Sequence, residues 1–278
     1  MKMKQLSIHL GHMMQGLPIG QRMQFARRLS CDLIEFPFPY EVTAAEYAEL
    51  LRRNALRQDL IIAPASNYNA GERGYAVDPQ LTQVFRNSIE KSIEYATCIG
   101  CRFIHVMSGC VDAQIDRSQA ISTMLENFVW AQRAIASAGF KMLIEPINSV
   151  DFPGYLVDRP SFALDICRSV GEGLGLLFDV YHCCVMGEDP AAFVQSSAKL
   201  VGHIQIADWP GRGEPGCAQF DFDGFFQTLA NVGYSGTLGL EYKPTLSLED
   251  SLRAVDAHIG GSLRHWLAHE VPHIPLVN

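Results

Sequence analysis

The sequence HIQIADWPGRGEPG at residues 203–216 predicts a buried strand that runs directly into an irregular loop. His203 and Gln205 fall on one face of this strand, and Ile204 and Ile206 fall on the other. The rest of the stretch is too rich in glycine and proline to form a helix or a strand. A polar amide at the end of an apolar strand, just before a loop that carries an arginine, is typical of a functional site.

Three other apolar runs end in an acidic residue in the same way. They are KMLI before Glu145, GLLF before Asp179 and TLGL before Glu241. The recurrence indicates that one strand–loop unit is repeated along the chain, and that each of these strands ends in a polar residue.

Eight predicted strands alternate with eight predicted helices. The strands lie at 6–9, 32–36, 59–63, 102–107, 141–144, 175–178, 201–205 and 237–240, and the helices at 18–28, from 43, at 78–99, at 118–138, from 158, from 190, at 222–231 and from 248. Such alternation predicts a parallel sheet. Eight units in 278 residues favour an α/β fold of the closed (β/α)8 TIM-barrel type, whose usual size is about 250 residues. No Gly-x-Gly-x-x-Gly follows the first strand, which argues against a dinucleotide-binding sheet. Because no linker divides the chain, we expect a single domain over residues 1–278.

The composition excludes several classes of protein. A hydrophobic content of 48% is ample for a large core, and a net charge of −8 argues against a nucleic-acid partner. No apolar run approaches the length of a membrane span, and the first residues lack the apolar region of a secretory signal. We therefore expect a cytoplasmic protein with no membrane partner, whose eight cysteines are reduced thiols.

The four polar strand ends are expected to converge. In a barrel the carboxyl ends of all strands meet at one rim, so Glu145, Asp179, Gln205 and Glu241 would line half of it. Three carboxylates packed together repel one another unless a cation neutralises them. Carboxylate and amide oxygens suit a divalent metal, with Mg²⁺ or Mn²⁺ as the expected ion. The alternative is that each acid merely ends a strand and caps the next helix.

Four further residues are candidates for the same site. His182 follows the second of these strand ends, Asp179, by three residues and would face a bound substrate, although a lone histidine is as often structural. Arg212 would clamp a substrate carboxylate or hydroxyl group, or be a solvated loop residue. Lys243 follows Glu241 by two residues and would contact the substrate or neutralise the acids. His203 lies one layer deeper than the amide and is expected to support the metal ligands from behind.

Motifs spread over residues 30 to 245 resemble those of the hydroxypyruvate isomerase family, within the wider group of xylose-isomerase-like barrels. They are GERG at 71–74, LIEPIN at 143–148, DFPG at 151–154, FDVYH at 178–182, HIQIAD at 203–208, PGRGEPG at 210–216 and GLEYKP at 239–244.

The resemblance implies a divalent metal held by Glu145, Asp179, Gln205 and Glu241, with Glu145 and Glu241 also acting as the acid/base pair. It implies an aldose–ketose isomerase of carbohydrate metabolism that interconverts hydroxypyruvate and tartronate semialdehyde through an enediolate. A small anionic hydroxy-oxo acid would then be the substrate, and a homodimer is expected from the family.

Several alternatives stay open. The Gly-Asp-Trp element that usually precedes GERG in the family is missing from residues 64–70, and the 2-oxo-tetronate isomerases share the other motifs. A ketose 3-epimerase acting on a free sugar would carry histidine in place of Gln205. A barrel that only binds a sugar acid would have no need of two proton-transfer carboxylates. An endonuclease IV-like activity would require more histidines and a basic face.

Overall fold

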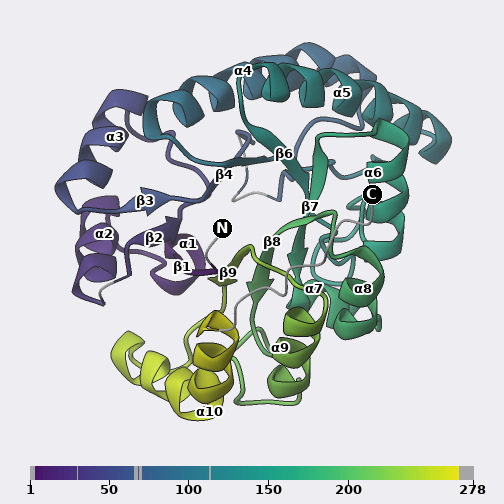
Figure 1. The fold of residues 1–278 in the computed structure, drawn as a ribbon. Coiled ribbons are helices and arrows are strands. Elements are labelled where there is room, and N and C mark those ends of the chain that lie inside the picture. Colours follow the sequence, from purple (N-terminus) through teal and green to yellow (C-terminus); the bar gives the residue numbers. More distant parts are fainter. Residues whose placement is uncertain (1–3, 30, 66–67, 69–70, 113, 269–278) are drawn as a thin grey trace, which may run out of the picture.

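The eight-stranded barrel predicted from the sequence is confirmed. We analysed a computed structural model, which describes residues 4–29, 31–65, 68, 71–112 and 114–268. In Figure 1 the strands lie in the middle of the molecule and the helices form a ring around them. Colours run around this ring in chain order, so successive βα units are neighbours in space.

All strand pairs are parallel and belong to one sheet with the order β3-β2-β1-β9-β8-β7-β6-β5-β4. The strands are β1 (Gln5–His9), β2 (Leu33–Glu35), β3 (Arg57–Gln58), β4 (Leu60–Ile62), β5 (Phe103–His105), β6 (Lys141–Ile144), β7 (Leu174–Asp179), β8 (Val201–Ile206) and β9 (Thr237–Leu240). The pairing of β1 with β9 joins the beginning of the barrel to its last strand.

The chain around the predicted third strand, 59–63, forms two short strands: β4 lies within the predicted bounds, and β3 lies before them, on the other side of Asp59. β3 pairs with β2, whereas β4 pairs with β5, so this one stretch of chain bridges the two ends of the sheet. The backbone N–H of Asp59 donates to Ile34, and its carbonyl accepts from the N–H of Arg102. The strand is divided where its pairing partner changes, and the Asp59 side chain at this point is buried and contacts His203 inside the barrel.

The helices that cover the barrel are close to those predicted. They are α1 (Leu10–Met13), α2 (Ile19–Arg28), α3 (Ala44–Arg53), the 3₁₀ helix η2 (Pro79–Leu81), α4 (Thr82–Ile99), α5 (Arg117–Ser137), α6 (Pro160–Val170), α7 (Val180–Val185), α8 (Pro190–Ser197), α9 (Phe222–Asn231) and α10 (Leu248–Ala268). Two short helices, α1 and α7, were not predicted. Each begins directly after a strand, at the rim where the site residues lie.

Local sequence signals explain where several helices begin and end. Thr43 and Glu46 form a capping box at the start of α3, which satisfies N–H groups that the helix leaves free. Asp116 accepts N–H groups of the first turn of α5, and Asp189 does the same for α8. α4 ends at Gly100, which adopts φ +70°, a conformation that glycine reaches without steric cost.

The strands carry one continuous apolar core that extends outward to the helices. All eight cysteines are unpaired. Within the described part of the chain, no helix is both long enough and apolar enough to cross a membrane.

Candidate active site

A cavity of about 1180 Å³ opens at the carboxyl ends of the strands. Side chains from the start, middle and end of the chain line it, as the barrel fold predicts. Among the residues predicted for the site, the lining includes Glu145, His182, Gln205, Arg212, Glu241 and Lys243. Asp179 lies just behind Arg212 and is almost completely buried. The structure therefore brings all four predicted metal ligands to the same end of the barrel.

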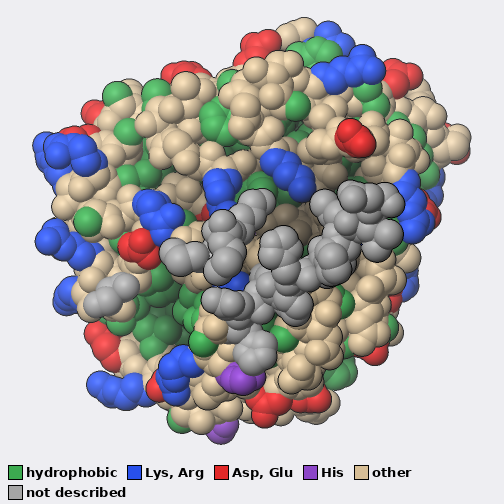
Figure 2. Space-filling view, viewed as in Figure 1, with side chains coloured by type: hydrophobic (Ala, Val, Ile, Leu, Met, Phe, Trp, Pro, Cys, Tyr) green, Lys and Arg blue, Asp and Glu red, His purple; other side chains and the backbone are tan. Residues whose placement is uncertain are grey.

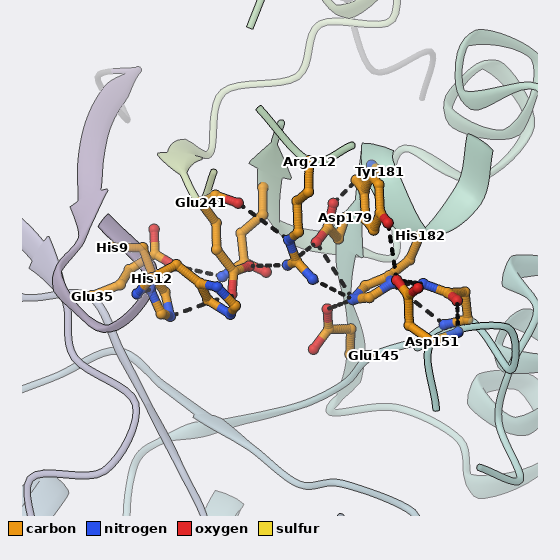
Figure 3. Close-up of polar contacts among 12 residues, drawn as sticks. His9, His12, Glu35, Glu145, Asp151, Asp179, Tyr181, His182, Arg212 and Glu241 are labelled. Atoms are coloured by element: carbon orange, nitrogen blue, oxygen red, sulfur yellow. Dashed lines mark hydrogen bonds and ion pairs between the residues drawn. The ribbon is translucent and has the colours of Figure 1, made fainter. Parts of the chain in front are cut away.

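Arg212 lies among the three predicted carboxylates (Figure 3). Its Nη2 atom is 2.7 Å from Oδ2 of Asp179 and 3.2 Å from Oε2 of Glu241. His182 lies close to two carboxylates, with Nε2 at 3.7 Å from Oε1 of Glu145 and from Oδ2 of Asp179. All five side chains are buried, so their charges interact with little screening by water.

The loop after β8 holds Arg212 in this position. Asp208 accepts the backbone N–H groups of four loop residues: Trp209, Gly216, Ala218 and Phe220. The backbone N–H of Arg212 donates to the carbonyl of Asp208, and its own carbonyl accepts from Lys243. Arg212 is thus tied by backbone hydrogen bonds to the ends of β8 and β9.

The three carboxylates carry more negative charge than one guanidinium can balance. Burial, together with the neighbouring carboxylates, raises the pKa of Asp179 and of Glu241 to about 7 in each case. Burial and the charges of Glu241 and Asp179 raise the pKa of Glu145 well above its ordinary value. A group of acids with raised pKa values is poised either to bind a cation or to exchange a proton near neutral pH.

The partners of His182 determine what its ring can do in the cavity. The Nδ1 atom lies 2.6 Å from Nδ2 of Asn148 and 3.4 Å from the backbone N–H of the same residue. Asn148 cannot be turned round without loss, because its amide oxygen accepts from the N–H of Asp151 and its Nδ2 donates to the Asp151 carboxylate. Nδ1 therefore accepts, and Nε2 carries the proton that points toward the carboxylates.

This tautomer favours His182 as a hydrogen-bond donor to a substrate oxygen. Glu145, Asp179 and His182 do offer ligand atoms within 4.8 Å of one another. A protonated Nε2, however, has no lone pair for a metal. Nη1 of Arg212 also lies 3.2 Å from Nε2. The two Asn148 contacts determine the tautomer, because one of them is much shorter than the Arg212 contact and the other comes from a backbone donor.

Gln205 presents a buried oxygen to the site. Its Nε2 donates to Oε2 of Glu35 at 2.7 Å, while its Oε1 has no hydrogen-bond partner. His203, two residues earlier in β8, contacts Oε1 of Glu35 at 2.9 Å and Oδ2 of Asp59 at 2.8 Å. His203 is thus linked to Gln205 through Glu35, which contacts both side chains.

The His203 ring is positively charged. Burial alone would lower its pKa, but the carboxylates of Glu35 and Asp59 raise the pKa to about 10. Burial would raise the pKa values of Glu35 and Asp59, yet His203 brings both below their ordinary values. Asp59 is also bonded to Arg102.

Three histidines that were not assigned to the site lie within it. Oε1 of Glu241 lies 3.4 Å from Nε2 of His9 and 3.3 Å from Nε2 of His12. Oε2 of Glu145 lies 3.7 Å from Nε2 of His105. Burial lowers their pKa values to about 4, 2 and 3 respectively, so all three rings are neutral at pH 7. His9 ends β1 and His105 ends β5, so the strand-end rule that selected the acids would also have selected these two.

Two further basic residues, Lys243 and Arg73, border the cavity. Lys243 is exposed and lines the cavity. Arg73, from the GERG motif, is buried between the rings of Tyr68 and Phe152, with its Cζ at 3.9 Å and 4.5 Å from the ring centres. Lys and Arg side chains are also visible around the middle of the face that Figure 2 draws, viewed as in Figure 1.

The described residues fit a divalent cation. The unpartnered Oε1 of Gln205 and the excess of buried carboxylate charge are both features that a cation would satisfy. The ligands would be oxygens of Glu145, Asp179, Gln205 and Glu241, and Arg212 would have to release part of its contact with Asp179.

Comparison with known proteins places this barrel in a family. The family model described as "Xylose isomerase-like TIM barrel" matches residues 23–258. The chain belongs to the xylose isomerase-like TIM-barrel family.

Its relatives include isomerases of sugar acids. A 2-oxo-tetronate isomerase of Cupriavidus necator is 39% identical, over 82% of this chain and 88% of that protein. A hydroxypyruvate isomerase of Escherichia coli is 34% identical, over 84% and 92% respectively. Among solved structures, one titled AP endonuclease, family 2, from Brucella melitensis superposes with a TM-score of 0.86 at 30% identity, over 91% of this chain and 98% of that one. The chain is an isomerase of this family.

Proposed function

We propose that this protein is a metal-dependent isomerase of a small hydroxy-oxo acid, converting hydroxypyruvate to tartronate semialdehyde or a 2-oxo-tetronate to its 3-oxo isomer. The observation that carries the proposal is the group of three buried carboxylates around a single arginine, beside an amide oxygen that has no hydrogen-bond partner. The names of the two relatives supply the two candidate substrates.

The reaction moves a hydrogen between two adjacent carbons. The carbon beside the substrate carbonyl loses a proton to one carboxylate, which leaves an enediolate across the two carbons. The hydroxyl hydrogen on the first carbon passes to the former carbonyl oxygen, and the other carboxylate supplies a proton to the former carbonyl carbon. Exchange with solvent then returns the two carboxylates to their starting protonation states. A bound Mg²⁺ or Mn²⁺ would stabilise the negative charge that develops on the two substrate oxygens.

Glu145 and Glu241 are the proposed proton-transfer pair. Both line the cavity, whereas Asp179 lies behind Arg212. The histidines beside both carboxylates are neutral and add no positive charge there. The pKa of Glu241, raised to about 7, allows proton uptake near neutral pH, and burial with the neighbouring carboxylates raises the pKa of Glu145 as well.

The donors around these carboxylates would orient the substrate. The proton on Nε2 of His182 points into the cavity and would bond a substrate oxygen. Arg212 is proposed to bind the substrate carboxylate once a cation has taken its place beside Asp179. Lys243 would attract the anionic substrate from the exposed edge of the cavity.

Product formation tests the proposal. Protein stripped of metal and reloaded with Mg²⁺ or Mn²⁺ is incubated separately with hydroxypyruvate, a 2-oxo-tetronate and a free ketose, and NMR follows the products. We expect one of the two acids to isomerise and the reaction to stop in EDTA. Epimerisation of the free ketose instead, or activity that EDTA leaves intact, would contradict the proposal.

A further inference from the structure

The amide of Gln205 is held in one orientation from outside the cavity. Its Nε2 donates to Oε2 of Glu35 at 2.7 Å, and its Oε1 is buried without a partner on the cavity side. The reverse orientation would set an amide oxygen against a carboxylate oxygen at that distance, with two acceptors facing each other. Only one orientation of the amide is therefore compatible with Glu35.

Glu35 is itself fixed. Its other oxygen, Oε1, accepts from the hydroxyl of Ser7 and from Nε2 of His203, which leaves Oε2 for Gln205 alone. The two charged partners are completely buried, so neither can exchange its contact for water. Gly239 makes room for the arrangement, because a Cβ atom there would collide with Oε1 of Glu35 and lie 2.9 Å from Nε2 of His203.

The far side of the His203 ring is anchored as well. Nδ1 of His203 lies 2.8 Å from Oδ2 of Asp59, which is bonded to Arg102. The two positive charges, on Arg102 and His203, balance the two negative charges, on Asp59 and Glu35. The Glu35 carboxylate therefore has no excess negative charge that would favour binding a cation from the cavity. A connected chain of contacts thus runs from Arg102 through Asp59, His203 and Glu35 to Gln205.

We propose that Glu35 is a positioning residue that fixes the Gln205 amide with its oxygen facing the cavity. Resting on the proposed function, this makes Gln205 an oxygen ligand of the cation, a role that the amide would lose if it could turn its NH2 group inward. Glu35 acts through Gln205 and is not expected to touch substrate or metal.

The orientation is tested first in the metal-free protein. With ¹⁵N-labelled glutamine, the side-chain amide signals of Gln205 are assigned by their loss in Gln205→Met. We expect these signals to exchange slowly with D₂O in the unaltered protein and at least about tenfold faster in Glu35→Leu. Rapid exchange in the unaltered protein would overturn the proposal and needs no variant that folds.

The consequence is tested by Mn²⁺ affinity. Removing a residue that orients a metal ligand weakens affinity by about 10- to 100-fold, which is the loss we expect for Glu35→Leu. The matched control is Tyr47→Phe, which removes another buried hydrogen bond, from the Tyr47 hydroxyl to Oε1 of Gln58, and leaves every residue of the chain from Arg102 to Gln205 unaltered. It is expected to bind Mn²⁺ within about twofold of the unaltered protein.

Equal Mn²⁺ binding by Glu35→Leu and the unaltered protein would overturn the proposal. An equal loss in Tyr47→Phe would also overturn it, because it would indicate a general structural effect. If the unaltered protein bound no Mn²⁺, the proposed function would fail, and slow exchange of the Gln205 amide would still support the role of Glu35.

Discussion

Two groups of buried carboxylates lie close together in this barrel and differ in how their charge is balanced. The cavity carboxylates, Glu145, Asp179 and Glu241, share one buried cation, Arg212, and have raised pKa values. The supporting pair, Glu35 and Asp59, encloses His203 and has lowered pKa values.

Burial is similar in the two groups, so it does not explain the difference. The deciding factor is whether each carboxylate has a cation of its own. A balanced group can serve as a fixed support, because it has no tendency to gain a proton or a metal near neutral pH. An unbalanced group is the one with capacity for binding and proton transfer.

The largest expected effect comes from removing a proton acceptor from the cavity carboxylates. Glu145→Gln and Glu241→Gln should each lower kcat by about 10²- to 10⁴-fold, because an amide cannot accept the transferred proton. The measurement is the initial rate of isomerisation with saturating metal. Circular dichroism serves as the control for folding, and a loss of less than about tenfold in both variants would contradict the assignment.

Breaking the balance of the supporting pair should instead reduce stability. His203→Leu removes the cation between two buried carboxylates and should lower the free energy of unfolding by about 3–5 kcal/mol. Urea denaturation of the metal-free protein measures this change. A loss below about 1 kcal/mol, in the range of an exposed ion pair, would show that the pair does not depend on His203.

The cavity carboxylates should also make metal binding depend on pH. Asp179 and Glu241, with pKa values of about 7, must lose protons before they bind a cation. Mn²⁺ affinity is therefore expected to increase between pH 6 and pH 8, by up to about tenfold per pH unit for each proton released. Because Asp179 and Glu241 have higher pKa values in the folded than in the unfolded chain, their protonated forms stabilise the folded state. This stabilisation of the metal-free protein is lost as the pH rises through about 7.

Isothermal titration at several pH values, in buffers with different heats of ionisation, measures both the affinity and the protons released. An affinity that does not change across this range would mean that the cavity carboxylates are already ionised without the metal.

The smallest effect on stability is expected from a substitution that places an additional methyl group beside the supporting pair without changing its charges. Gly239→Ala places a methyl group against Glu35 and His203 and should lower stability by about 1–3 kcal/mol. The measurement is the melting temperature in thermal unfolding. The control is Gly213→Ala, because the nearest atom to a Cβ at that position is a Thr245 methyl group at 3.8 Å. Equal melting temperatures for the two variants would show that the space around Glu35 is not restricted.

The sequence was sufficient to predict the barrel and the convergence of the acids. Each βα unit has its own strong signals, and the barrel geometry then determines which strand ends meet. Strand-end residues of the second half of the chain were identified for this reason. Applied equally to the first half, the same rule would have selected Glu35, His9 and His105, which end β2, β1 and β5.

Other features depend on three-dimensional contacts that no local pattern contains. The third strand divides at Asp59 because the residues before it pair with β2 and those after it with β5, and the side chain of Asp59 contacts His203, which is 144 positions away. The inward placement of His12 depends on the short helix α1, whose four residues are too few to give a periodic signal. The contact of Arg212 with Asp179 depends on how a glycine-rich loop folds back over β7.

The central claim is that the unbalanced carboxylates transfer a proton, and deuterium incorporation tests it most directly. Metal-loaded protein is incubated in D₂O with whichever acid it isomerises, and NMR follows the hydrogens on the two reacting carbons. We predict that solvent deuterium enters the product or the recovered substrate, and that Glu145→Gln and Glu241→Gln abolish this incorporation. Isomerisation without any deuterium in either compound would indicate direct hydride transfer between the carbons and would contradict the account.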